Sequence, residues 1–204
     1  MGYQKIMKYS VVIRTLGKAG EKYQTLLNSL RQQTLLPERI LVYIAEGYSI
    51  PKETCGKVEY IYVPKGMVAQ RALRYDEVQT DYILMLDDDV YLPGDAVERL
   101  FREMFENGGD VISPDVFHNA DRTRKREILM TLSGRIYARN RDNEWGYKIM
   151  LNGGYSYNKY PRPVMRSQTN AGPCLLCRKC DFLGISFEDE SWLDEMPYAL
   201  GEDQ

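Results

Sequence analysis

The sequence predicts an α/β protein with a Rossmann-like, mostly parallel sheet that is flanked by helices. Over the first 115 residues, apolar or β-branched runs alternate with segments that carry a helical apolar stripe, which is typical of strand–helix–strand units. Residues 82–86 are aromatic or aliphatic throughout, as expected of a strand covered on both faces in a parallel sheet. The chain has 204 residues, of which 44% are hydrophobic, so it can bury the core that such a domain needs.

The predicted elements begin with a strand at residues 9–14, a β-branched run that ends at Thr15 and a glycine-containing loop. A helix follows and ends near residue 33. Its apolar side chains recur at i, i+3, i+4 and i+7, the spacing of one helix face: Tyr23, Leu26, Leu27 and Leu30.

Two strands come next, at residues 39–45 and 58–63, and proline residues stand before the first and after the second. The second of these strands alternates along its length, as a short half-buried strand does. We expect another helix from about Met67 to Val78, which leads into the strand that begins at Tyr82.

After the Tyr82 strand, Pro93 suits the first turn of a third helix, and the Asn-Gly-Gly sequence at 107–109 ends it. Its apolar stripe is clear: Val97, Leu100, Phe101, Met104 and Phe105. A fifth strand is predicted at 111–113. Between 120 and 170 the pattern blurs, and residues 147–160, rich in Gly, Asn and Tyr, are expected to form a mobile loop over a functional site.

Three consecutive carboxylates, Asp87, Asp88 and Asp89, directly follow the apolar strand. In open α/β sheets, ligands bind beyond the carboxyl ends of the strands, where these residues would lie. Adjacent negative charges repel one another, and Mg²⁺ typically takes one or two protein carboxylates together with substrate phosphates. The cluster therefore indicates a metal–diphosphate site. An acidic loop that only leaves the strand for water is the alternative.

A second candidate metal motif involves three cysteines at C-x-x-C-x-x-C spacing: Cys174, Cys177 and Cys180. This spacing occurs in zinc and iron–sulfur sites. A fourth ligand would have to be Cys55 or His118, and neither has a partner at metal-binding spacing. Residues 172–178 also have the pattern of a buried strand, in which cysteine acts as a small hydrophobic residue, and we adopt this interpretation.

Charge is informative by its position rather than its sum. The net charge of −2 gives no overall attraction to nucleic acid or membranes. Basic residues gather between 121 and 141, where they could meet a phosphate-bearing substrate, and acids without Lys or Arg fill the chain from Asp181 onward, where they could flank a reaction centre. A solvated face explains either run equally well. No apolar run approaches 18 residues and the N-terminus lacks a signal-peptide core, so we expect a cytoplasmic protein.

Five segments, in chain order, resemble the motifs of family 2 glycosyltransferases with the GT-A fold. They are Ser10–Thr15, Ile40–Gly47, Ala69–Arg71, Leu86–Asp89 and Gly201–Gln204. The likeness runs over essentially the whole chain. It implies a single GT-A domain of residues 1–204, in which residues 1–115 bind the nucleotide sugar and residues 116–204 form a smaller acceptor-side part.

The resemblance implies an inverting, metal-dependent enzyme of glycan or polysaccharide synthesis. Its expected donor is a nucleotide diphosphate sugar, in the first place a UDP-sugar, and its expected acceptor is a hydroxyl group of a saccharide or lipid-linked saccharide. It assigns Mg²⁺ or Mn²⁺ to Asp89 and Asp87, the role of general base to Asp203, and an orienting role to Glu202. The implied nucleotide-sugar contacts are Arg14, Thr15, Glu46, Arg71, Asp87 and Asp88.

The chain also departs from the family pattern. Ala45-Glu46 replaces the usual acidic pair, and Ala72 replaces the Asn expected after Arg71. The sequence stops directly after the Glu-Asp motif, so we expect that C-terminal acceptor-binding elements are missing. No nucleic acid partner and no transmembrane segment are expected, and peripheral contact with the inner face of a membrane stays open.

Three alternatives use the same acids. A non-catalytic nucleotide-sugar-binding domain would keep the Asp87–Asp89 motif. A phosphatase of the haloacid dehalogenase type would carry that motif on its first strand, with Thr or Val in place of Tyr91. A calcium loop counted from Asp87 has Glu98 at position 12, but Leu92 stands at position 6, where Gly is required.

Overall fold

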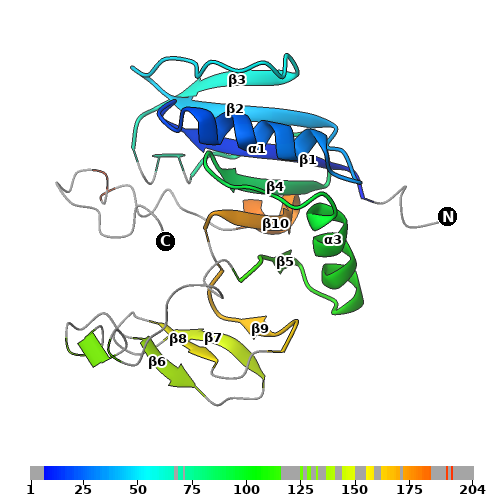
Figure 1. Cartoon of the computed structure of the whole chain (residues 1–204), viewed down its shortest axis with the longest axis vertical. Coiled ribbons are helices and arrows are strands. Elements are labelled where there is room, and N and C mark those ends of the chain that lie inside the picture. Colours follow the sequence, from blue (N-terminus) through cyan, green and yellow to red (C-terminus); the bar gives the residue numbers. More distant parts are fainter. Residues whose placement is uncertain are drawn as a thin grey trace. The chain divides into compact units, whose positions relative to one another are not determined.

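The structure is a computed structural model. It describes residues 7–66, 69–70, 72–115, 125, 128–129, 132, 137–140, 144–149, 155–158, 162–170, 172–184, 192 and 194. The chain forms two compact units (Figure 1): unit 1 comprises Met1–Pro114 with Gly172–Gln204, and unit 2 comprises Asp115–Ala171. In the described part of the chain, no helix combines the length and hydropathy needed to cross a bilayer.

A six-stranded sheet forms the centre of unit 1, in the order β3-β2-β1-β4-β10-β5. Its strands are β1 (Tyr9–Thr15), β2 (Arg39–Ala45), β3 (Val58–Val63), β4 (Tyr82–Asp87), β5 (Val111–Ile112) and β10 (Cys174–Arg178). Strand β1 pairs in parallel with β2 and β4, and β2 pairs in parallel with β3. Among the described strands of this sheet, the antiparallel pairs are those of β10 with β4 and with β5, so β10 runs opposite to the others. The predicted α/β class with a mostly parallel sheet is therefore confirmed.

The chain order reverses between β1 and β4. From β1 the chain passes through α1 (Glu21–Arg31) to β2 on one side and then to β3, whereas β4 lies on the other side of β1. This reversal is a topological switch point, and ligands of open α/β sheets bind at its carboxyl edge. Thr15 ends β1 there and Asp87 ends β4.

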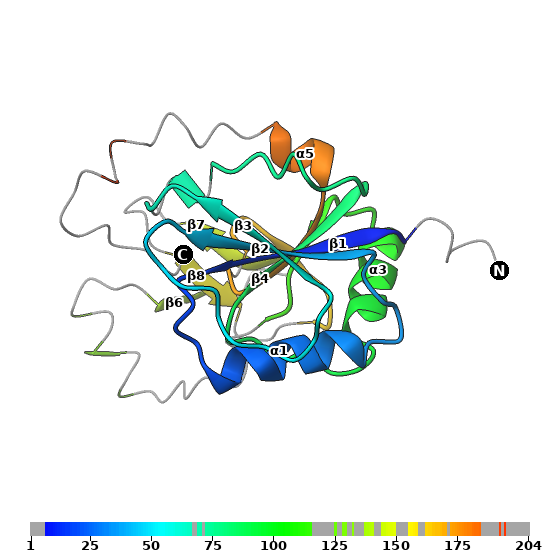
Figure 2. The same ribbon diagram turned by 90° about the horizontal axis from the view of Figure 1, so that it is seen from above.

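Helices cover both faces of the sheet. Figure 2 shows α1 and α3 (Ala96–Glu106) on one face and the short α5 (Lys179–Leu183) on the other. The alternating side chains of β1 divide between two cores as a result, with Val11 and Ile13 facing α1 and α3 and Val12 facing the opposite side. Strands buried on both faces explain why the predicted strand sequences are so continuously apolar.

The helix expected at 67–78 is the first correction. Ala69 and Gln70 are helical, but residues 72–80 form bends and turns, and Tyr75 has a positive φ of 51°. Tyr75 and Val78 are buried in the second core, so tertiary packing over the open face of the sheet overrides the helical pattern of this segment.

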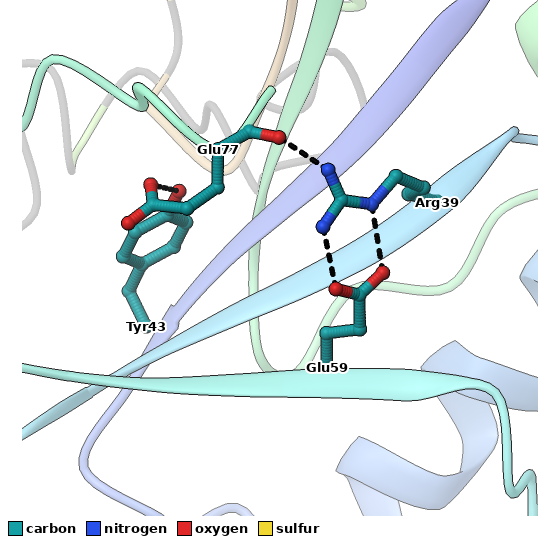
Figure 3. Close-up of polar contacts among 4 residues, drawn as sticks. All are labelled: Arg39, Tyr43, Glu59 and Glu77. Atoms are coloured by element: carbon teal, nitrogen blue, oxygen red, sulfur yellow. Dashed lines mark hydrogen bonds and ion pairs between the residues drawn. The ribbon is translucent and has the colours of Figure 1, made fainter. Parts of the chain in front are cut away.

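Polar contacts fasten the same segment to the sheet (Figure 3). Tyr43 Oη donates a hydrogen bond of 2.8 Å to Glu77 Oε2, and Arg39 Nη1 donates to the Glu77 backbone carbonyl. Arg39 also forms a bidentate ion pair with the carboxylate of Glu59, with an Nε–Oε1 distance of 2.7 Å. Residues of β2 and β3 thus hold the turn at residues 76–77 against the sheet.

The second correction concerns residues 147–160, which were expected to form a mobile loop. They contain most of β7 (Trp145–Ile149) and all of β8 (Tyr155–Asn158), which pair antiparallel. With β6 (Tyr137–Asn140) and β9 (Arg166–Ser167) they form a four-stranded sheet, in the order β6-β8-β7-β9, in unit 2. The tyrosines that suggested a loop are favourable strand residues, and the buried Ser156 and Asn158 alternate with them.

Candidate functional site

The carboxyl ends of four parallel strands meet at one edge of the unit 1 sheet. The register pairs Thr15 of β1 with Ile44 of β2, and Arg14 of β1 with Asp87 of β4. Glu46 directly follows β2 at the same edge, where its backbone N–H donates to the Val63 carbonyl of β3 at 2.8 Å. The fold therefore brings Arg14, Thr15, Glu46 and the aspartates together at one edge.

A side-chain hydrogen bond crosses the switch point. The Thr15 hydroxyl donates to a carboxylate oxygen of Asp88, and the Gly17 backbone N–H donates to Thr15 Oγ1 at 2.7 Å. Thr15 is buried and Asp88 is half-buried, so the bond is partly shielded from water. It fixes the turn after β4 against the turn after β1.

The two loops after β1 and β2 also pack backbone against backbone. Gly17 has a φ of 70°, and a Cβ at this position would lie 2.4 Å from the Ser49 carbonyl oxygen. A side chain is excluded by both the conformation and the space, so glycine is required here. The same glycine donates its backbone N–H to the Thr15 hydroxyl oxygen, so this loop contact also orients Thr15.

The environment of Asp88 disfavours the ionised form of its carboxylate. Burial raises the pKa of Asp88 above its ordinary value, and the negative charge of Asp89 raises it further. The Thr15 hydrogen bond lowers this pKa, yet the net shift stays upward. A cation placed among these carboxylates would remove the penalty, because opposite charge favours the ionised form.

Asp89 is more exposed and pairs with a residue that sequence reasoning missed. Lys22 Nζ lies 3.1 Å from Asp89 Oδ2, with side chains 70% and 49% exposed respectively. Exposed ion pairs of this kind contribute about 0–1 kcal/mol, so a divalent cation could displace Lys22 at little cost. The position of Lys22, at the start of the helix after β1, is the signal that could have suggested it.

Asp87 is half-buried and is the last residue of β4. Its backbone N–H donates to the Pro173 carbonyl at 3.1 Å, which ties it to the segment before β10. Its charge also reaches Cys174, whose thiol pKa is raised to about 12, mainly by burial and further by Asp87. Strand alternation places Asp87 on the side of Arg14, its register partner in β1.

The residue types at the edge suit a magnesium or manganese ion that is bound partly by protein carboxylates and partly by substrate phosphates. Among the described residues, no group of three His, Cys, Asp or Glu side chains forms a complete metal site. Asp88 and Asp89 bond to different side chains, Thr15 and Lys22. One or two carboxylates are what Mg²⁺ uses when substrate phosphates complete its coordination, and this set fits that number.

The first two cysteines of the motif lie in a buried strand, as we interpreted residues 172–178, whereas Cys180 is exposed in α5. Cys174 and Cys177 lie in β10 and are buried, one in each of the two cores. Burial raises the pKa of the Cys177 thiol to about 12, as it does for Cys174, so both stay protonated. Neutral thiols on opposite faces of a sheet are not metal ligands.

A cationic aromatic cluster, formed by Lys18, Tyr48 and Lys65, lies at the same edge and was also missed. Lys18 Nζ lies 5.1 Å and Lys65 Nζ 5.4 Å from the centroid of the Tyr48 ring. These residues follow β1, β2 and β3, in that order. The edge therefore carries carboxylates after β4 and ammonium groups after β1 and β3.

Three of the predicted site residues lie outside the described part of the chain: Arg71, Glu202 and Asp203. Their roles remain predictions. The same holds for most of the basic stretch at 121–141.

Comparison with known proteins identifies one family. The sequence model described as glycosyl transferase family 2 matches residues 10–156, which include every described residue of the candidate site. No curated protein matches the chain.

Solved structures resemble the chain only distantly. Residues 1–349 of TarS from S. aureus share 16% identity with a TM-score of 0.39, covering 65% of this chain and 50% of that one. A longer TarS structure shares 17% identity with a TM-score of 0.37, and the match covers 52% of this chain and 21% of that chain. The chain thus spans half or less of these TarS chains. A 4-diphosphocytidyl-2C-methyl-D-erythritol synthase from Anaerococcus prevotii shares 10% identity, covering 95% and 80% of the two chains, with a TM-score of 0.43.

Proposed function

The chain belongs to glycosyl transferase family 2, and we propose that it moves a sugar from a nucleotide diphosphate, with uridine as the preferred nucleoside, to an acceptor hydroxyl. The observation that carries the proposal is the Thr15–Asp88 contact at the β1/β4 switch point, with Asp87 and Asp89 on either side of it in sequence. This is where an open α/β sheet binds a nucleotide.

In this proposal each part of the edge contacts a different part of the donor. Asp89 and Asp87 hold Mg²⁺ or Mn²⁺, which when bound stabilises the charge of the diphosphate leaving group as a Lewis acid. Asp88 keeps its bond to Thr15 and so fixes the turn that presents the other two carboxylates. Lys22 leaves Asp89 and becomes free to face the diphosphate.

The nucleoside lies along the carboxyl ends of β1 and β2. Thr15, Glu46 and Arg71 contact the base and Arg14 lies beside the ribose, while the Lys18–Tyr48–Lys65 cluster lines the outer end. Two strand spacings separate β4 from β2, about 10 Å, which matches the reach from a diphosphate to its base.

The acceptor reacts on the sugar face opposite the diphosphate, which gives inversion. Asp203 removes the proton of the acceptor hydroxyl as general base, and Glu202 orients it. The acceptor is a saccharide or lipid-linked saccharide of glycan or polysaccharide synthesis, and the reaction takes place in the cytoplasm, where peripheral contact with the membrane would bring a lipid-linked acceptor within reach.

Titration calorimetry with UDP, ADP and GDP, each with Mn²⁺ and with EDTA, tests the donor half of this proposal. We expect UDP to bind most tightly, EDTA to weaken binding, and Asp89→Asn to weaken UDP binding about tenfold or more while uridine binding changes little. Asp81→Asn, which removes an exposed carboxylate next to the opposite end of β4, is the matched control and should bind as wild type does. Equal UDP binding with and without metal would refute the metal site.

The transfer half is tested with Asp203→Asn. A general base touches the acceptor rather than the donor, so this variant should bind UDP normally and lose on the order of 10²–10⁴-fold in turnover. Binding of UDP-sugars without any turnover by the wild-type chain would instead identify the non-catalytic nucleotide-sugar-binding alternative.

A further inference from the structure

Two buried polar side chains at the end of α1 have no role in the site described above. Ser29 lies near the end of the helix and Gln33 directly follows its C-cap, and their exposed fractions are 2% and 5%. Buried polar groups cost free energy unless they are hydrogen-bonded, so their partners show which segments they hold together.

Both side chains bond to the loop after β4, which comprises residues 88–95 and is called the β4 loop. The Leu92 backbone N–H donates to Ser29 Oγ at 3.3 Å. Gln33 Nε2 donates to the Pro93 carbonyl at 2.7 Å and to the Ser29 carbonyl at 3.1 Å. The end of α1 thus holds both a donor and an acceptor of the β4 loop backbone.

Gln33 also caps α3. The Val97 backbone N–H donates to Gln33 Oε1 at 3.1 Å. Asp95, the N-cap residue of α3, makes no capping hydrogen bond with its own side chain in the described structure. A residue outside the helix therefore satisfies one of the N–H groups that the first turn of α3 leaves open. One side-chain amide joins the end of α1, the β4 loop and the start of α3.

These contacts anchor the β4 loop on the far side of Asp89. On the near side, the loop begins with Asp88, whose carboxylate accepts the Thr15 hydrogen bond. Three residues, Asp89 to Tyr91, bridge the two anchors. A bridge of this length has few conformations once both of its ends are fixed, so the anchors restrict the direction of the Asp89 side chain.

The exposure pattern indicates that the bridge is extended. Asp89 and Tyr91 are exposed, whereas Val90 is partly buried and Leu92 is buried, both in the core that faces α1 and α3. Alternation with a period of two is typical of an extended chain. A slip of one residue along α1 would therefore turn Asp89 toward the core and Val90 toward solvent. The hydrogen bonds to Leu92 and Pro93 oppose this slip.

Helix α1 also contacts Asp89 directly, through the ion pair with Lys22 at 3.1 Å. Seven residues of helix, from Lys22 to Ser29, rise by about 10.5 Å, and three extended residues, from Asp89 to Leu92, span about 10 Å. The two contacts are therefore spaced alike on the helix and on the loop, and the loop follows α1 in the same direction. If a metal displaces Lys22, the contacts of Ser29 and Gln33 still hold the loop to the helix.

We propose that Ser29 and Gln33 are positioning residues, which hold the β4 loop in register along α1 and so direct the Asp89 carboxylate to the donor edge. This inference rests on the proposed function, because Asp89 is the proposed metal ligand. Neither Ser29 nor Gln33 touches the donor, and both act through Asp89.

Two variants of the full chain test the proposal. Gln33→Met keeps the size of the side chain but removes its donor and acceptor, and Ser29→Ala removes the acceptor for Leu92. Two controls change other contacts. Thr34→Ala removes the 2.7 Å bond to Glu98, which joins α1 to α3 without touching the β4 loop. Tyr43→Phe removes a 2.8 Å bond on the other face of the sheet and so controls for a general loss of stability.

The measurements are the affinity for UDP with Mn²⁺ and with EDTA, the affinity for uridine, and the ¹³C resonance of the Asp89 carboxyl group without ligand. Gln33→Met should weaken UDP binding with Mn²⁺ about threefold to tenfold, because groups that orient a metal ligand affect metal affinity, and should change uridine binding little. Ser29→Ala should have a smaller effect in the same direction, and both controls should bind as the wild type does.

The double variant Gln33→Met/Asp89→Asn tests whether Gln33 acts through Asp89. Once Asp89→Asn has removed the carboxylate, Gln33→Met should cause no further loss of UDP affinity. An equal loss in both backgrounds, an equal loss for uridine, or an equal loss in Tyr43→Phe would overturn the proposal, and so would unchanged affinity in Gln33→Met. If Gln33→Met does not fold, Ser29→Ala decides by the same criteria.

Failure of the proposed function looks different, because the wild type would then bind UDP equally well with Mn²⁺ and with EDTA. The ligand-free resonance of Asp89 decides in that case. A shift in Gln33→Met that is absent in Tyr43→Phe supports the positioning of Asp89 by α1, and an unmoved resonance overturns it.

Discussion

At the residue scale, the three consecutive aspartates have different environments although the sequence makes them look equivalent. Asp88 is held by Thr15, Asp89 is paired with Lys22 at the surface, and Asp87 lies on the side of Arg14. Their location after a buried strand could be predicted from the sequence. Lys22 could not be assigned as a partner, because the contact depends on how α1 leaves the sheet edge.

Asp88→Asn should stabilise the fold while it weakens metal-dependent binding. The folded protein binds the Asp88 proton more tightly than the unfolded chain does, since the pKa is raised mainly by burial. The ionised carboxylate therefore costs stability above the raised pKa, and this cost disappears as the pH falls below the ordinary carboxyl range, about 3.9. Asn removes the charge and can still accept the Thr15 hydrogen bond.

Urea unfolding at pH 7 and at pH 3.5 measures this effect without metal. The stability gain of Asp88→Asn should be present at pH 7 and nearly absent at pH 3.5, and UDP binding with Mn²⁺ should be weaker than in the wild type. A variant that is less stable at pH 7 would show that the carboxylate stabilises the turn more than its charge costs.

At the scale of elements, local pattern was sufficient where it agreed with tertiary packing. The α1 stripe is fully buried against the sheet, and the helix forms where its periodicity predicted it. The segment at 72–80 contains similar residues but covers the second face of the sheet together with α5, with Tyr75 packed edge-on against Tyr43 at a ring-centroid distance of 5.1 Å. Burial of Tyr75 and Val78 there required a turn, and no periodicity in the sequence indicates that requirement.

Tyr→Phe substitutions at Tyr75, in this segment, and at Tyr43, in β2, should have opposite effects on the free energy of unfolding. Tyr75 is 2% exposed, and its hydroxyl has no hydrogen-bond partner among the described residues, so Tyr75→Phe removes a buried polar group and should be neutral or stabilising by up to about 1 kcal/mol. Tyr43→Phe removes the 2.8 Å bond to Glu77 and should cost about 0.5–1.5 kcal/mol.

Tyr75→Ala provides the scale for both values, because loss of a buried aromatic side chain costs about 3–5 kcal/mol. Chemical unfolding followed by circular dichroism gives all three differences. If Tyr75→Phe lowers the free energy of unfolding as much as Tyr43→Phe does, the Tyr75 hydroxyl has a hydrogen-bond partner in solution. That partner would then lie outside the described residues.

At the scale of the whole molecule, the antiparallel strand β10 is what the sequence could not place. Residues 172–178 were recognised as a buried strand, but the insertion of β10 between β4 and β5 pairs positions about 90 residues apart, such as Cys174 with Leu86. Pairing at such separation leaves no local pattern. The insertion matters for the site because it brings Pro173 to the Asp87 N–H.

The two units carry one tryptophan each, which allows their stabilities to be measured separately. The chain has two Trp residues; Trp145 belongs to unit 2 and Trp192 to unit 1. Trp145→Phe therefore leaves a fluorescence reporter of unit 1, and Trp192→Phe leaves a reporter of unit 2. If the units unfold as separate cooperative blocks, the two variants will report different transitions.

UDP with Mn²⁺ should then stabilise the transition reported by Trp192. All described donor-edge residues lie in unit 1, and a ligand that binds only the folded state adds about 2.7 kcal/mol at 100 times its Kd. EDTA should remove most of this gain, and uridine alone should give little, because the metal joins the carboxylates to the diphosphate. A shift of equal size for the Trp145 reporter would mean that unit 2 either unfolds together with unit 1 or binds the donor itself. Asp89→Asn separates these two outcomes. If the units unfold together, this variant should lose the metal-dependent shift of both reporters. If unit 2 binds UDP independently, the Trp145 shift should remain.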